Sequence, residues 1–197
     1  DDLELDLFES QYIIPEGMAY NSYLIDDDKV TIMDSVDCRK TAEWLNNLEQ
    51  TLNGKTPDYL VILHCEPDHS SSAVELLNKY PNCKLVTSAK ALPLLKQFYN
   101  HFDFDSRFLE VKENEVLPLG KHTLTFLSAP MVHWPEVMVA YENSEQILFS
   151  ADAFGKFGAL VNETDDWACE ARRYYFNICG KYGVQVQNLI KKLTNLN

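Results

Sequence analysis

The sequence lacks a surplus of basic residues and lacks any long apolar run. Lys and Arg number 17 against 30 Asp and Glu, which gives a net charge of −13. Nucleic acids and anionic membranes attract basic surfaces, so neither is an expected partner. The longest strongly apolar stretch, Tyr59–Leu63, has the length of a strand, whereas a helix that spans a membrane needs about 20 apolar residues. The first residues are acidic, and no secretory signal peptide is expected.

Paired cysteine motifs and glycine-rich loops are also missing. The five cysteines are odd in number and form no C-x-x-C motif, which argues against a disulfide scaffold and against a cysteine-ligated zinc site. We expect buried or half-buried thiols in a reducing cytoplasm. No G-x-x-x-x-G-K or G-x-S-x-G motif occurs, so neither a phosphate-binding loop nor a serine nucleophile of that type is expected.

A length of 197 residues with 46% apolar residues predicts a single globular domain that covers residues 1–197. Apolar periodicity predicts strands and helices that alternate, with a block of strands in the middle, which is typical of a layered α/β sandwich. Asp37 is a candidate cap for the first helix, and Ser72 with Glu75 forms a capping-box pattern before the second. The expected strands are Tyr20–Ile25, Val30–Asp34, Tyr59–Leu63, Lys84–Thr87, Arg107–Val111, Thr123–Ser128, Val137–Tyr141 and Gln146–Ser150, and the expected helices are Arg39–Leu52, Ala73–Tyr80, Ala89–Tyr99, Trp167–Cys179 and Val184–Leu193.

Metal-ligand side chains are concentrated in the hexapeptide His64-Cys-Glu-Pro-Asp-His69, which follows the buried strand Tyr59–Leu63 directly. Ends of strands are where α/β sheets place their functional sites. On an extended backbone, residues two apart point to the same side, so His64 and Glu66 are expected to act together. Asp68 and His69 follow in the loop and could serve a second metal. Burying these imidazoles and carboxylates without partners would cost several kcal/mol, and a pair of bound metal ions would remove this cost. The alternative is a solvated acidic loop that binds no metal.

Two further candidate ligands also follow predicted strands. His133 lies after Thr123–Ser128, and Asp152 lies after Gln146–Ser150. Either alone would be an ordinary turn or capping residue, but with the hexapeptide they complete a constellation in which an aspartate could bridge two cations. The other histidines, His101 and His122, are expected at the solvated surface.

Three segments carry a resemblance to a known family. The motifs H-x-E-x-D-H, A-P-x-x-H-W-P-[DE] and F-S-x-D-A-F-G are similar to those of the diiron domain of flavodiiron proteins, which are members of the metallo-β-lactamase fold superfamily. The likeness extends to Leu7–Tyr12, Gly17–Ile25 and Ala171–Tyr182, and therefore spans essentially the whole chain. It implies an αββα sandwich of the metallo-β-lactamase type, incomplete at the C-terminus.

The resemblance also implies a site, an activity and partners. The family reduces O₂ to water or NO to nitrous oxide at two irons. Its electrons come from FMN on a flavodoxin-like domain. A rubredoxin-like protein or a flavin reductase donates electrons to this FMN. Its subunits pair head to tail as dimers or tetramers. Carried over, the ligands of the first iron would be His64, Glu66 and His133, those of the second would be Asp68 and His69, and Asp152 would bridge both.

The chain departs from relatives of the same fold in informative ways. Hydrolytic relatives use H-x-H-x-D-H and bind zinc, whereas Glu66 adds an oxygen donor here and favours iron. The family's further histidine in an H-G-P motif and its flavodoxin-like half are both missing. The simplest expectation is a fragment of a longer protein, with a natural short form as the alternative, and in either case a chain that is not fully active alone. Two alternatives stay open: a zinc-dependent hydrolase of the same superfamily, with zinc in place of iron, and an inactive truncated module.

Overall fold

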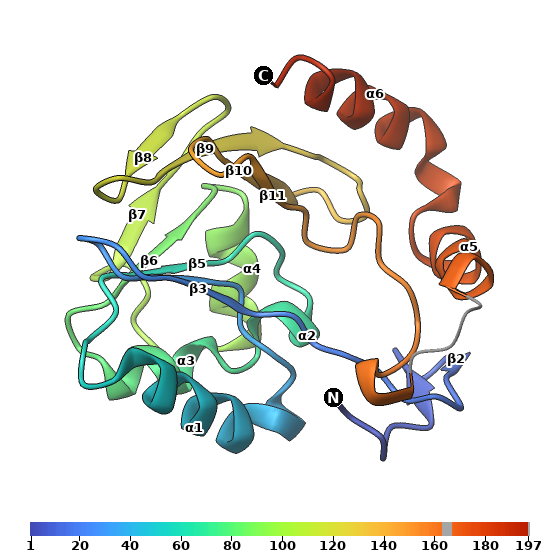
Figure 1. Cartoon of the computed structure of the whole chain (residues 1–197), viewed down its shortest axis with the longest axis horizontal. Coiled ribbons are helices and arrows are strands. Elements are labelled where there is room, and N and C mark those ends of the chain that lie inside the picture. The colour runs from blue at the N-terminus through green and yellow to red at the C-terminus, as the bar shows by residue number, and fades with distance from the viewer. Residues whose placement is uncertain (163–166, 197) are drawn as a thin grey trace.

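The computed structural model describes residues 1–162 and 167–196. Two sheets lie face to face, and helices cover the outer face of each (Figure 1). The first sheet has the strand order β3-β4-β5-β6-β7, and the second has the order β11-β10-β9-β8. The strands are β1 Leu7–Phe8, β2 Tyr12–Ile13, β3 Tyr23–Ile25, β4 Thr31–Met33, β5 Tyr59–Val61, β6 Lys84–Thr87, β7 Phe108–Glu110, β8 Val116–Pro118, β9 Thr123–Ser128, β10 Met138–Glu142 and β11 Ile147–Phe149.

The helices divide between the two outer layers. Those from the N-terminal half, α1, α3 and α4, lie against the first sheet, and α5 and α6 lie against the second (Figure 1). The α-helices are α1 Thr41–Leu52, α2 Pro67–Ser70, α3 Ala73–Lys79, α4 Ala91–Phe98, α5 Trp167–Ile178 and α6 Gly183–Leu193, and the short 3-10 helices are Cys38–Lys40, Leu160–Asn162 and Gly180–Tyr182. Within the described ranges, no helix has the length and apolar character needed to cross a bilayer.

Three apolar clusters fill the spaces between the four layers. Trp44 and Leu48, one helical turn apart on α1, pack with the buried Leu60 of β5 between the first helical layer and its sheet. Phe126 of β9 and Val61 of β5 belong to the cluster between the two sheets. A third cluster joins the outer face of the second sheet to α5 and α6. This is the predicted αββα sandwich.

The pairing of the strands explains where the loops meet. In the first sheet β4, β5, β6 and β7 run parallel, and β3 is antiparallel to β4. The second sheet is antiparallel throughout. Because parallel strands end at the same edge, the segments that follow β4 and β5 lie side by side at that edge. The Leu63 N–H donates to Asp34 Oδ1 at 2.7 Å across this edge.

Most predicted elements are present, with ends that differ by a few residues, and several short ones were missed. The structure adds the hairpin β1–β2, the strand β8 and the single helical turn α2. The Asp37 side chain accepts from the Arg39 N–H, so it caps the 3-10 turn that leads into α1. The predicted capping box at Ser72 is wrong: Ser72 is at the N-cap position of α3, but its hydroxyl lies 2.6 Å from Thr41 Oγ1 and accepts from no backbone N–H of α3.

Three expectations about exposure need correction. Cys38 and Cys169 are exposed, whereas the other three cysteines are buried as expected. Cys38 is exposed because it begins a 3-10 turn on the surface of the first helical layer. His122 is only partly exposed, because Nδ1 lies 3.2 Å from the buried carboxylate of Glu142. His101 is exposed, as predicted.

Candidate metal centre

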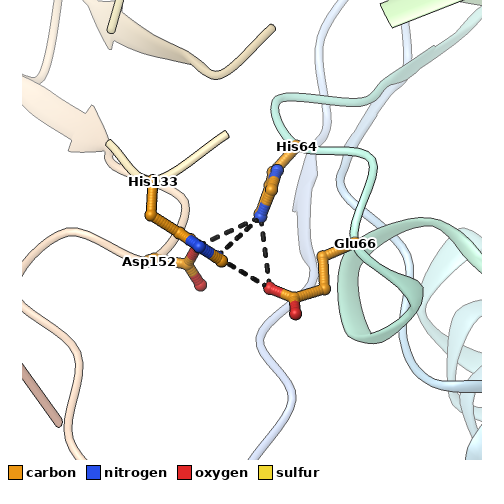
Figure 2. A group of neighbouring side chains, drawn as sticks. All are labelled: His64, Glu66, His133 and Asp152. Carbon is orange, nitrogen blue, oxygen red and sulfur yellow. Dashed lines mark hydrogen bonds and ion pairs between the residues drawn. The ribbon is translucent and has the colours of Figure 1, made fainter. Parts of the chain in front are cut away.

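Four of the candidate ligands, on segments that follow β5, β9 and β11, point toward one another (Figure 2). His64 and Glu66 follow β5, His133 follows β9, and Asp152 follows β11. All six residues that the sequence singled out lie in two adjoining groups. The first group is His64, Glu66, His133 and Asp152, and the second is Asp68, His69 and Asp152.

The first group is compact and buried. His64 Nε2 lies 3.2 Å from Glu66 Oε2 and 3.3 Å from His133 Nε2, and His133 Nε2 lies 3.0 Å from Glu66 Oε2 (Figure 2). Asp152 Oδ2 completes the group at 3.3 Å from His64 Nε2. Four donor atoms within 4.8 Å of one another are arranged as they would be around one cation.

The helical turn α2 separates the second group from the first. Glu66 precedes the turn, and Pro67 occupies its first position, where a missing N–H costs nothing. The turn redirects Asp68 and His69, so that His69 Nε2 lies 3.0 Å from Asp152 Oδ1 and 3.6 Å from Asp68 Oδ2. The sequence predicts a loop at Asp68 and His69, whereas the structure has them in the helical turn α2.

Asp152 belongs to both groups through different atoms. Its Oδ2 faces His64 and His133, and its Oδ1 faces His69. Oδ1 also accepts a hydrogen bond of 2.8 Å from the Tyr174 hydroxyl. Gly155 makes room for this contact, because a Cβ there would lie 2.9 Å from the Asp152 carbonyl oxygen and 3.0 Å from the Tyr174 ring. The carboxylate is therefore held in an orientation that offers one oxygen to each group.

Two further carboxylates orient the histidines from outside the groups. Glu136 Oε1 lies 2.9 Å from His64 Nδ1, and Asp34 Oδ2 lies 3.1 Å from His69 Nδ1. A carboxylate can only accept, so each Nδ1 carries the proton, and each Nε2 is left as a potential ligand. Sequence reasoning missed both residues, although Glu136 lies in the quoted motif around His133 and Asp34 ends a predicted strand.

Burial and charge together shift the protonation of the cluster. Burial opposes the charged form of His64, but the carboxylate of Asp152, then those of Glu136 and Glu66, outweigh it and raise the pKa to about 9. Burial likewise opposes charge on His133, but Asp152 and Glu66 raise its pKa to about 10. Burial raises the pKa of Asp68 to about 7. Protonated histidines thus neutralise the carboxylates without a metal, and a cation that binds here must displace protons.

The donor set fits a pair of metal ions. Asp68 Oδ1 is buried and accepts no hydrogen bond from the described residues, and an orphaned acceptor of this kind is costly unless a cation faces it. Imidazole nitrogens and carboxylate oxygens together suit iron, and the orienting carboxylates on His64 and His69 are typical of metal-bound histidines.

A hairpin from the N-terminal segment brings a further carboxyl group to the first group. Glu9 and Ser10 form the tip of the β1–β2 hairpin with φ of 49° and 57°, a conformation in which Gly and Asn are more usual. Burial and, after it, the neighbouring carboxylate of Glu66 raise the pKa of Glu9 to about 8. The resemblance covered this segment, but no role for Glu9 was predicted.

The two groups differ in access. The Trp134 ring stands edge-on to His64, with centroids 5.1 Å apart, and covers the first group. A cavity of about 180 Å³ reaches the second group and is lined by Tyr20, Asp68 and His69 among others. Phe154 also lines this cavity and is 63% exposed, whereas Trp134 packs onto His64. Cys65 packs on α4, where its thiol lies 3.6 Å from the Ala91 carbonyl oxygen.

The fold and the cluster together define a metallo-β-lactamase-like domain with a His, Glu and Asp cluster suited to metal binding. The protein-family model described as ODP family beta lactamase matches residues 18–179, and the chain belongs to this family.

Several known proteins are similar to the chain. An anaerobic nitric oxide reductase flavorubredoxin from Aliivibrio fischeri is 32% identical over 200 residues, a match that covers 98% of this chain and 40% of the relative. The flavodiiron protein from Giardia intestinalis superposes with a TM-score of 0.91 at 30% identity, over 100% of this chain and 49% of that one. Rubredoxin oxygen:oxidoreductase from Desulfovibrio gigas superposes with a TM-score of 0.91 at 32% identity, over 98% of this chain and 49% of that one. The chain therefore spans about half or less of the length of these relatives.

Proposed function

We propose that the chain is the diiron domain of an enzyme that reduces O₂, NO or both. Its first iron position is formed by His64, Glu66 and His133, its second by Asp68 and His69, and Asp152 is shared between them. The observation that carries the proposal is the arrangement of Asp152, whose two oxygens face different groups of ligand-type side chains. The relatives named for nitric oxide reduction and for oxygen reduction support the choice of substrates.

Iron is favoured over zinc by the oxygen donors. Glu66 stands where the zinc hydrolases of this fold have a histidine, and it lies 3.0 Å from His133 Nε2 inside the first group. Carboxylate oxygens are harder donors than imidazole nitrogens, and they stabilise the ferric state. Zinc is the natural substitute, because raw affinity alone favours it over ferrous iron.

The side chains of this domain prepare the site for a small uncharged substrate. Two bound irons would each supply an electron and a Lewis-acidic position for the diatomic molecule. Trp134 packs edge-on against His64 at the first position, whereas the cavity beside His69 leaves the second position accessible. Glu9 lies at the edge of the first group, where burial and, after it, Glu66 raise its pKa to about 8.

We also propose that residues 1–197 constitute one domain of a longer enzyme. A flavodoxin-like domain with FMN would supply the electrons, a rubredoxin-like protein or a flavin reductase would reduce it, and a head-to-tail dimer would bring the FMN of one subunit to the irons of the other. The relatives named flavorubredoxin and rubredoxin oxygen:oxidoreductase support the flavin and the rubredoxin-like donor. None of the five cysteines forms a disulfide within the described ranges, which supports a cytoplasmic location.

Metal analysis after purification without oxygen and without added metal tests the proposal. We expect iron as the main metal, with His133 and Glu66 variants depleted of it. One addition of O₂ or NO should oxidise the iron of the reduced chain, and the absorbance of the iron measures this oxidation. With NO, nitrous oxide should form. Zinc as the only metal, with hydrolysis of ester or thioester probes, would replace the proposal by the hydrolase alternative. Absence of any metal would leave an inert module.

A further inference from the structure

Glu136 is a buried carboxylate outside both groups of proposed ligands. It lies three residues after His133 and is 2% exposed. Its neighbours in the sequence are Pro135 and Val137, and β10 begins at Met138. Burying a carboxylate is costly unless it is fully engaged, so the position of Glu136 needs a reason.

One oxygen of Glu136 fixes both the ring and the backbone at the start of the hexapeptide. Oε1 accepts from the Cys65 N–H at 3.0 Å and lies 2.9 Å from His64 Nδ1. Because Oε1 can only accept, His64 carries its proton on Nδ1 and presents the lone pair of Nε2 to Glu66, His133 and Asp152. The two contacts determine the tautomer of His64 and the plane of its ring.

The other oxygen of Glu136 shows that these contacts are not ordinary core packing. Oε2 is buried and accepts no hydrogen bond from the described residues. A group kept only for local structure would be better replaced by an amide or by an apolar residue of similar size. The hydrogen bonds that engage the Glu136 carboxylate from the described side chains and from Cys65 thus converge on Oε1, at the start of the hexapeptide.

We propose that Glu136 is a positioning residue for the first metal position and acts on it through His64. The inference rests on the proposed function, since it requires metal at that position. Asp34 makes the equivalent contact to His69 in the second group, so each position has its own orienting carboxylate. Removing one carboxylate should therefore weaken one position and spare the other.

Anaerobic titration of the full chain with Co²⁺ tests this separation, because the visible absorbance of Co²⁺ reports its coordination. The difference between wild type and His133→Ala identifies the absorbance of the first position. Glu136→Leu should lower the Co²⁺ affinity of the first position by about 10- to 100-fold and leave the second position unchanged. Glu136→Gln, which keeps an oxygen acceptor, should lose less. Asp34→Asn is the matched control, with its loss confined to the second position.

The outcomes separate this inference from the proposed function. A wild-type chain that binds no Co²⁺ overturns both. A wild-type chain that binds two Co²⁺ ions, with unchanged first-position affinity in Glu136→Gln and Glu136→Leu, overturns only the role of Glu136. Equal weakening of both positions in Glu136→Leu also overturns it, since that is the result of general structural damage. Circular dichroism establishes that each variant is folded, and Glu136→Gln decides the question if Glu136→Leu is not.

Discussion

At the scale of the residue, Asp152 differs from the other five proposed ligands because it serves two groups at once. Its orientation is fixed by Tyr174 on one side and by three histidines around it. Removal of this side chain takes a donor from both positions, whereas removal of His69 takes a donor from only one. The two residues therefore offer a direct test of the assignment of roles.

Asp152→Ala should lose both metals, and His69→Ala should retain most of the metal at the first position. The measurement is iron per chain by mass spectrometry after anaerobic purification, with circular dichroism as a control for folding. Equal losses in the two variants would contradict the assignment.

The proposed ligands could be predicted from the sequence, but their orienting partners could not. His64, Glu66, Asp68 and His69 lie within six consecutive residues, so their clustering is local information. Glu136 meets His64 from 72 positions away, and such a pairing depends on how the strands are ordered in space. Glu9 was missed for the same reason, since a hairpin far away in the sequence carries it to Glu66.

At the scale of the element, the turn between β10 and β11 depends on one buried carboxylate. Glu142 accepts from the backbone N–H groups of Glu145 at 2.6 Å, Ser144 at 3.0 Å and Thr123 at 3.3 Å. Burial opposes its charge, but these donors outweigh burial and lower its pKa from 4.5 to about 2. A lowered pKa contributes stability above the unfolded value, and this contribution is lost as the pH falls through the folded value.

Glu142→Ala should lower the free energy of unfolding by about 1–3 kcal/mol at pH 7, because backbone donors lose a charged acceptor. The difference from wild type should shrink as the pH falls from 4.5 towards 2. Urea unfolding at pH 7 and at pH 2.5 measures it, and Glu145→Ala, an exposed side chain in the same turn, is the control. A difference that stays constant with pH would contradict the role of the charge.

The contrast between β8 and β9 gives a second prediction at this scale. Leu124 of β9 is fully buried between the sheets, whereas Val116 of β8 is 53% exposed. Leu124→Ala should cost about 2–5 kcal/mol in the free energy of unfolding, because it leaves a cavity. Val116→Ala should cost less than about 0.5 kcal/mol, and urea unfolding distinguishes them. Similar costs would show that the space between the sheets adapts to the loss.

Elements with a long apolar pattern were predictable, and the short ones were not. Helix α1 shows its buried residues at helical spacing in the sequence. Strand β8 has an exposed, partly exposed, exposed pattern over only three residues, and β1 and β2 have two residues each, so none carries a readable period. Ser72 failed as a cap because a tertiary contact with Thr41 engages its hydroxyl.

At the scale of the whole molecule, the proposed ligands come from both halves of the sandwich. The hexapeptide follows a strand of the first sheet, and His133 and Asp152 follow strands of the second. A metal at the first position would thus join the two sheets. The layered architecture was predictable from the alternation of elements and from the family resemblance, but the distances between the two sheets' loops come only from the folded structure.

Removal of metal should therefore lower the thermal stability of the chain. A ligand at 1,000 times its dissociation constant stabilises a fold by about 4 kcal/mol, which for a chain of this size is roughly 8–16 °C in Tm. Thermal unfolding of the iron-loaded chain before and after treatment with a chelator measures the shift. Asp152→Ala should show no such shift, and an unchanged Tm after metal removal from wild type would contradict a structural link between the sheets.

The positions of the proposed ligands along the chain also determine the order in which they are synthesised. His69 and Asp152 are 83 positions apart, and ribosomes add about 5–20 residues per second, so about 4–17 s pass between their synthesis. For most of this interval a nascent chain displays His64, Glu66, Asp68 and His69 without the aspartate that would join the two positions, and His133 is added before Asp152. With the proposed ligands, both positions are therefore complete only once β11 and the segment after it have been synthesised.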